Sequence, residues 1–142
     1  MSIHNQLNHM YWPLRLCYGL VPIVAGADKF TNLLTDWSQY LPAAAANVLP
    51  FDAAVFMMVV GVIEILAGLA VLTMLTRLGG YIVAAWLLLI AINVALAGYL
   101  DIAVRDIVMA LGAYTLSGLA AVRGEPLFPG AVVHPSQSPS TA

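Results

Sequence analysis

The stretch AAVFMMVVGVIEILAGLAVLTMLT, residues 53–76, contains one charged side chain, that of Glu64. A helix of this length can cross the hydrocarbon core of a bilayer. Glu64 lies near the middle of the stretch, about 16 Å from its nearer end at the rise of an α-helix. A carboxylate at that depth costs free energy unless it is protonated, paired or hydrogen-bonded. The stretch therefore predicts a membrane-spanning helix that carries a buried polar site.

The composition of the whole chain extends this prediction to a single integral membrane domain. Of the 142 residues, 62% are hydrophobic and 8% are charged, and a soluble domain carries about three times that charge. The net charge of −2 and the lack of a basic stripe argue against a nucleic-acid partner. Cys17 is the only cysteine, which excludes an intrachain disulfide and a dithiol redox centre. Membrane lipids are therefore the first partners expected.

Three more apolar segments accompany the first, so we expect an all-α membrane protein built as an antiparallel four-helix transmembrane bundle. The predicted membrane domain covers residues 1–123, with spans at about 10–27, 53–76, 78–100 and 102–123. The second and third spans meet at Thr76-Arg77, which predicts a tight hairpin. Residues 124–142 are rich in proline and serine and predict a C-terminal tail without a core of its own.

The distribution of basic residues predicts the orientation of the four spans. An even number of spans places both termini on one side of the membrane. That side carries three arginines and the other side two basic residues; these are Arg15, Arg77 and Arg123 against Lys29 and Arg105. The positive-inside rule then predicts that both termini are cytoplasmic.

The segment between the first two spans predicts a short helix at the outer membrane interface. Its apolar residues recur at helical spacing: Phe30, Leu33, Leu34, Trp37 and Leu41. Trp37 and Tyr40 suit the level of the lipid headgroups, where aromatic residues anchor helices. The helix either caps the bundle as a plug or serves as a gate or docking surface for a partner.

Each predicted span has one face of small and polar residues, which is typical of helices that pack around a polar centre. Three kinds of compensation are open to Glu64. It pairs with Arg15, it accepts a hydrogen bond from Asn93, Tyr18 or Ser117, or it is protonated. Glu64 then either locks the helices together or belongs to an intramembrane ligand or proton site, which we predict from Arg15, Glu64 and Asn93.

A second group of charges is predicted at the outer end of the bundle: Asp28, Lys29, Asp101, Arg105 and Asp106. If the first and fourth spans are neighbours, Lys29 pairs with Asp101 or Asp106, and Arg105 pairs with Asp28. The group is either a clamp that fixes helix register or a site for an anionic headgroup, a quinone or a small oxyanion. At about half a membrane thickness from Glu64, it is expected to be a separate site.

These motifs, in this order and spacing, resemble the DoxX-like family of small four-helix bacterial membrane proteins. The matching elements fall between residues 11 and 123: Arg15 with Gly19, Gly26-Ala27-Asp28-Lys29-Phe30, Glu64-Ile65-Leu66-Ala67-Gly68, Thr76-Arg77-Leu78-Gly79, and Asp101-Ile102-Ala103-Val104-Arg105-Asp106. The resemblance implies a protein of the bacterial inner membrane. It also implies a relationship to subunits associated with a quinol oxidase and with thiosulfate:quinone oxidoreductase.

Three functions are compatible with these residues. The first is a non-catalytic subunit or scaffold of a larger, redox-linked membrane assembly, not an enzyme on its own, because no nucleophile–base pair is evident. Its partners are other membrane subunits or further copies of the chain. The second is a quinone- or small-molecule-binding oxidoreductase component, with quinone or lipid as ligand and no intrinsic cofactor or metal. The third is a small proton or solute transporter that uses Glu64.

Overall fold

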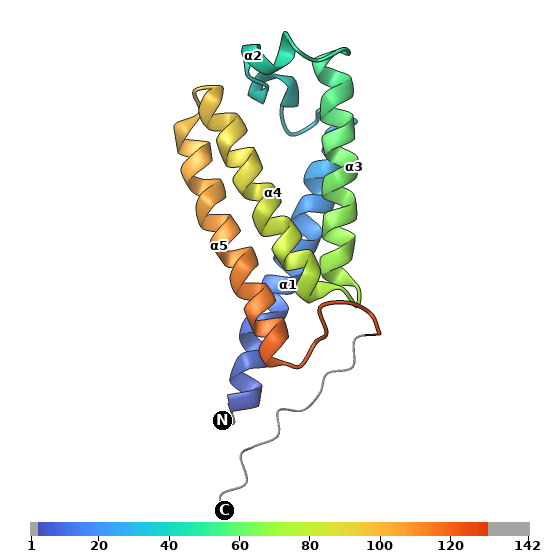
Figure 1. Ribbon diagram of the computed structural model, residues 1–142, viewed down its shortest axis with the longest axis vertical. Coiled ribbons are helices and arrows are strands. Elements are labelled where there is room, and N and C mark those ends of the chain that lie inside the picture. The colour runs from blue at the N-terminus through green and yellow to red at the C-terminus, as the bar shows by residue number, and fades with distance from the viewer. Residues whose placement is uncertain (1–2, 131–142) are drawn as a thin grey trace, which may run out of the picture.

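The computed structural model describes residues 3–130, which form helices and no strand (Figure 1). Four long helices pack against one another: α1 (Ile3–Asp28), α3 (Ala53–Leu72), α4 (Thr76–Leu96) and α5 (Leu100–Val122). The loop between α1 and α3 contains a 3₁₀ turn, η1 (Trp37–Tyr40), and the one-turn helix α2 (Ala43–Ala46). The predicted all-α class is confirmed, and of the predicted tail only residues 124–130 are among those described.

Three of these helices, α3, α4 and α5, are long and apolar enough to cross a membrane. Their outward faces carry large apolar side chains that are more than half exposed, for example Val104, Ile107, Val108 and Leu111 on α5. An apolar surface this extensive is unfavourable in water and suits lipid. Within the described residues, helix α1 is not among the helices that are both long and apolar enough to cross a membrane. It contains Arg15 and two prolines.

Helices α1 and α3 cross closely because glycines face each other at the contact. A Cβ atom built on Gly61 lies 2.5 Å from the Gly26 carbonyl oxygen, and one built on Gly68 meets the Gly19 carbonyl. Small residues allow the backbones of membrane helices to approach in this way. The crossing lays α1 along α3, with the C-terminal end of α1 beside the first half of α3.

The turn between α3 and α4 is at residues 73–75, slightly earlier than the predicted hairpin at Thr76-Arg77. Thr76 begins α4, and its hydroxyl donates to the carbonyl oxygens of Val71 and Thr73 at 3.0 and 3.2 Å. We call this end of the molecule, which also holds the start of α1 and the end of α5, the hairpin end (Figure 1). The opposite end, with η1 and α2, is the loop end.

Candidate functional site

A cavity of about 1080 Å³ lies between the long helices and below η1. Aromatic side chains make up much of its wall: Tyr18, Trp37, Tyr40, Phe56 and Trp86. The otherwise apolar lining also contains charged and polar side chains, among them Lys29, Glu64, Asn93, Arg105 and Asp106. A concave, mostly apolar space of this size with a few polar groups is typical of a small-molecule site. No group of three or more metal-ligating side chains that could hold an ion occurs within residues 3–130.

Inside this cavity Glu64 is paired with Lys29. The Lys29 Nζ donates to Glu64 Oε2 at 2.6 Å, and the two side chains are only 4% and 8% exposed. Lys29 directly follows α1, and the close crossing of α1 and α3 brings its long side chain to the middle of α3. The opposite charges of Lys29 and Glu64 compensate each other for the loss of water. Lys29 is therefore the partner that the Glu64 carboxylate needs within an apolar helix.

The 3₁₀ turn η1 is fastened to this pair by Trp37. The Lys29 ammonium lies 3.7 Å from the centroid of the Trp37 ring, a cation–π contact. The Trp37 Nε1 donates to Asp28 Oδ2 at 2.8 Å. Asp28 accepts further hydrogen bonds from the loop, donated by the Thr31 hydroxyl and the backbone N–H groups of Leu33 and Leu34. The predicted interfacial anchors, Trp37 and Tyr40, therefore line the cavity, and Tyr40 also packs edge-on against Tyr99 at 5.0 Å.

The pKa of Asp28 makes this loop sensitive to acid. Burial raises the pKa, but hydrogen bonds from Trp37, Leu34, Leu33 and Thr31 favour the charged carboxylate and lower it overall. A lowered folded-state pKa stabilises the loop above the ordinary carboxyl pKa of about 3.9. That stabilisation is lost as the pH falls through the lowered value.

We therefore expect Trp37 fluorescence to change as the pH is lowered below about 4, because protonated Asp28 releases the indole. The measurement uses a chain with Trp12→Phe and Trp86→Phe, in which Trp37 is the remaining tryptophan. In that background Asp28→Asn should have the altered fluorescence already at neutral pH. Asp36→Asn, which affects the cap of η1, is the matched control. If the Asp28→Asn variant shows the same acid transition, the fluorescence change does not come from protonation of Asp28.

Asp106 reaches the same cavity from α5. The residue is only 7% exposed, and no hydrogen bond or ion pair from the described part of the chain meets its carboxyl. Its neighbour Arg105 is exposed and also lines the cavity, whereas Asp101 is exposed and lies outside the lining. Glu64 and Asp106 lie close enough to interact electrostatically.

The predicted outer charge group is therefore wrong in its pairing and in its separation from Glu64. Lys29 pairs with Glu64, not with Asp101 or Asp106, and Asp28 binds the loop instead of Arg105. The reason is that the end of α1 packs against α3, so that Lys29 is directed towards the middle of that helix. Lys29, Glu64 and Asp106 all line one cavity.

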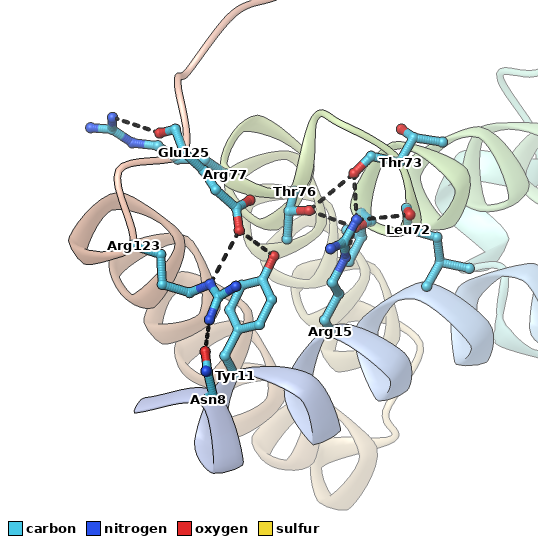
Figure 2. Close-up of polar contacts among 10 residues, drawn as sticks. Asn8, Tyr11, Arg15, Leu72, Thr73, Thr76, Arg77, Arg123 and Glu125 are labelled. Atoms are coloured by element: carbon cyan, nitrogen blue, oxygen red, sulfur yellow. Dashed lines mark hydrogen bonds and ion pairs between the residues drawn. The ribbon is translucent and has the colours of Figure 1, made fainter. Parts of the chain in front are cut away.

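Arg15, which the sequence suggested as a partner of Glu64, lies at the hairpin end instead (Figure 2). Its guanidinium donates to the carbonyl oxygens of Val71, Leu72 and Thr73 at 3.1, 2.9 and 2.6 Å. These carbonyls end α3, where helix carbonyls lack partners and where the helix dipole favours a cation. Val71 is about 10 Å from Glu64 along the helix axis. The predicted Arg15–Glu64 pair is wrong because Arg15 caps α3.

The other suggested donors to Glu64 also bind backbone carbonyls. The three hydrogen bonds are Asn93 Nδ2 to Tyr40 O at 2.8 Å, Tyr18 Oη to Met109 O at 2.7 Å, and Ser117 Oγ to Arg77 O at 2.9 Å. Each joins two elements of the fold. Asn93 still lines the cavity, so of the predicted trio Arg15, Glu64 and Asn93 the structure brings only the last two to one site.

A separate polar cluster joins α1 to the chain that follows α5 (Figure 2). The fully buried Tyr11 donates its hydroxyl to Glu125 Oε1 at 2.5 Å. Arg123 lies 3.4 Å from the same oxygen, 4.2 Å from the centre of the Tyr11 ring, and donates to Asn8 Oδ1. These contacts lie at the hairpin end, outside the cavity lining, and their effect is to hold the segment after α5 against α1.

Sequence reasoning missed the Lys29–Glu64 pair and the contribution of Trp86 to the cavity. One signal for the pair was present, because Gly26 and Gly61 lie three residues before Lys29 and Glu64 respectively. Facing glycines indicate where two membrane helices approach. Nothing comparable distinguishes Trp86 from an aromatic residue that packs against lipid.

Comparison with known proteins gives one match. Residues 11–97, more than half of the chain, match the family model described as DoxX. The match includes Lys29, Glu64 and Asn93, whereas Asp106 lies beyond it. Searches of curated proteins and of solved structures found no match.

Proposed function

Because this chain belongs to the DoxX family and its apolar helices make it a membrane protein, we propose that it is a ligand-binding subunit of a larger membrane assembly. The proposed ligand is a quinone-class molecule held in the cavity between the long helices. The observation that supports this function best is the buried Lys29–Glu64 pair in the wall of a largely apolar cavity of about 1080 Å³.

The proposed topology is a four-span bundle in the bacterial inner membrane, with both termini cytoplasmic. The start of α1 and the end of α5 lie at the same end of the molecule (Figure 1), in agreement with an even number of spans. Arg15, Arg77 and Arg123 contact groups at that hairpin end. Basic residues concentrate on the cytoplasmic side of membrane proteins.

The chemistry of the cavity favours a ring that carries carbonyl groups and an apolar chain. The Lys29 ammonium has three N–H donors, and only one of them is needed for Glu64. A ligand carbonyl can accept from another, while the aromatic walls pack against the ring. Glu64 holds the ammonium in place, and an apolar tail fits the remaining lining. We propose a subunit because electron transfer to such a ring requires a redox partner to supply the electrons.

Neutralising the pair is expected to weaken quinone binding. The double variant Lys29→Met/Glu64→Gln removes the donor while avoiding an unpaired buried charge, and we expect at least about a tenfold loss of affinity. The measurement is equilibrium dialysis of a short-chain alkyl benzoquinone against the full chain in lipid nanodiscs, together with quinone analysis of lipid that co-purifies with it. Asp101→Asn, on the exposed start of α5, is the control. Unchanged affinity in the double variant would reject this site.

A further inference from the structure

The cavity is a cleft between two pairs of helices. Helix α1 packs along α3, and α4 packs along α5, whereas α1 touches α5 much less. One tie between the pairs is the hydrogen bond from the Tyr18 hydroxyl to the Met109 carbonyl oxygen, at 2.7 Å. Helices α3 and α4 meet at the hairpin end and separate towards the loop end (Figure 1). The space that they leave, together with α1 and α5, contains the cavity of about 1080 Å³.

The rim of this cleft is exposed at the outer surface of the helices. Four residues of the lining are exposed and come from three helices: Cys17, Val21, Leu89 and Arg105. Because α4 and α5 are apolar enough to cross a membrane, their exposed residues face lipid chains. A largely apolar cavity also tends to exclude water. The cleft is therefore continuous with the hydrocarbon of the bilayer, and a lipid chain can enter it from the side.

Arg105 is the charged group on this rim. The other charged side chains of the lining are buried: Lys29, Glu64 and Asp106. No hydrogen bond or ion pair within residues 3–130 meets the Arg105 guanidinium, although Asp106 follows it and Asp101 lies one turn before it. A guanidinium has five N–H donors and no acceptor. The rim therefore offers a cation to an anionic group outside the chain.

The depth of Arg105 defines which anionic group this is. Arg105 is five residues after Leu100, which begins α5, and thus about 7.5 Å from that end of the helix. The start of a spanning helix lies near the lipid headgroups, and a long arginine side chain can reach them. A guanidinium also binds phosphate oxygens in a bidentate fashion. We propose that the cleft is a phospholipid site, in which Arg105 binds the headgroup phosphate and one acyl chain occupies the cavity.

This site goes beyond the proposed function, because its ligand is a different molecule and its polar contact is a different residue. The buried Lys29–Glu64 pair takes no part in binding the headgroup. The acyl chain uses the apolar lining that a quinone-class ligand would also need. The two ligands are therefore expected to compete for the cavity.

The experiment is native mass spectrometry of the full chain, released from detergent micelles that contain two lipids in equal amounts. The lipids are dioleoyl phosphatidylglycerol and the diacylglycerol with the same acyl chains, which lacks the phosphate. We expect one lipid bound to each chain, with the phospholipid preferred by about tenfold, because a hydrogen bond between charged groups contributes a factor of this size.

Variants of Arg105 test the contact with the phosphate. Arg105→Gln removes the charge and should abolish the preference for the phospholipid over the diacylglycerol. Arg105→Lys is the matched control, since it keeps a cation at the same exposed position, and it should retain most of the preference. A preference that persists in Arg105→Gln, or equal binding of the two lipids to the unmodified chain, overturns the proposed site.

A second pair of variants tests whether the acyl chain lies in the cleft. Val21 and Val24 are both exposed on α1, at 52% and 57%, but only Val21 lines the cavity. Val21→Trp fills the rim and should lower the amount of either bound lipid at least tenfold, whereas Val24→Trp should not. If Val21→Trp does not fold, Leu89→Trp replaces it, with Leu88→Trp as its control outside the lining.

The outcome for the lipid is separate from the outcome for the quinone. If Val21→Trp and Leu89→Trp both bind lipid as the unmodified chain does, the lipid lies on the outer surface and the site is overturned. A chain that binds no lipid but still binds the benzoquinone saturably overturns this inference and leaves the proposed function intact. A chain that binds the phospholipid as expected, but no benzoquinone even after the lipid is removed, overturns the proposed function alone.

Discussion

Replacing Lys29 by methionine is expected to lower the stability of the protein by about 3–5 kcal/mol, which is the usual effect of removing one member of a buried ion pair. The substitution leaves the Glu64 carboxyl in an apolar environment without the ammonium that now lies 2.6 Å away. It also removes the cation–π contact that holds Trp37 over the site. Unfolding of the purified chain in mixed micelles, followed by circular dichroism as denaturing detergent is added, measures the loss.

The control for this prediction is the neutral pair. Lys29→Met/Glu64→Gln removes both charges together, and replacing a whole buried pair by neutral groups is often close to neutral for stability. We therefore expect the double variant to recover most of the stability that Lys29→Met loses, while its affinity for quinone stays at least about tenfold below that of the unmodified protein. If Lys29→Met is as stable as the unmodified protein, the buried Glu64 carboxyl does not need Lys29 as its partner.

Substitution of Gly26 by alanine is expected to destabilise the protein by about 3 kcal/mol, at the upper end of the usual effect of overpacking. The added Cβ meets the backbone carbonyl oxygen of Gly61 on α3. A backbone atom cannot move aside as a flexible side chain can, so the two helices have to separate. The same unfolding assay measures this change, and weaker quinone binding should accompany it because the crossing positions Lys29 against Glu64.

Gly118 on α5 provides the matched control for this substitution. It is exposed, and a Cβ built there meets no atom within 4 Å. Gly118→Ala is therefore expected to be neutral or to stabilise the protein by up to about 1 kcal/mol, because alanine is the better helix former. Equal effects of the two substitutions would contradict the close crossing of α1 and α3.

The position of Glu64 shows how far sequence reasoning can reach. Its place in an apolar stretch indicates a buried carboxyl that needs compensation, and the structure provides that compensation within a cavity. The partner was not predictable, because Arg15 on α1 and Lys29 directly after α1 were both available. Arg15 binds the carbonyls that end α3, and those acceptors exist only where a neighbouring helix ends beside it.

The sequence by itself determined the all-α class, the apolar helices and the need for a partner for Glu64, because these follow from composition and from helical periodicity. Only the tertiary structure decided that Lys29, Trp86 and Asp106 line the same cavity as Glu64. Periodicity identifies the polar face of each helix, but it does not identify the helix that this face meets. In this protein that choice depends on backbone contacts between glycines, above all Gly26 and Gly61, whose close approach is a property of the packed helices.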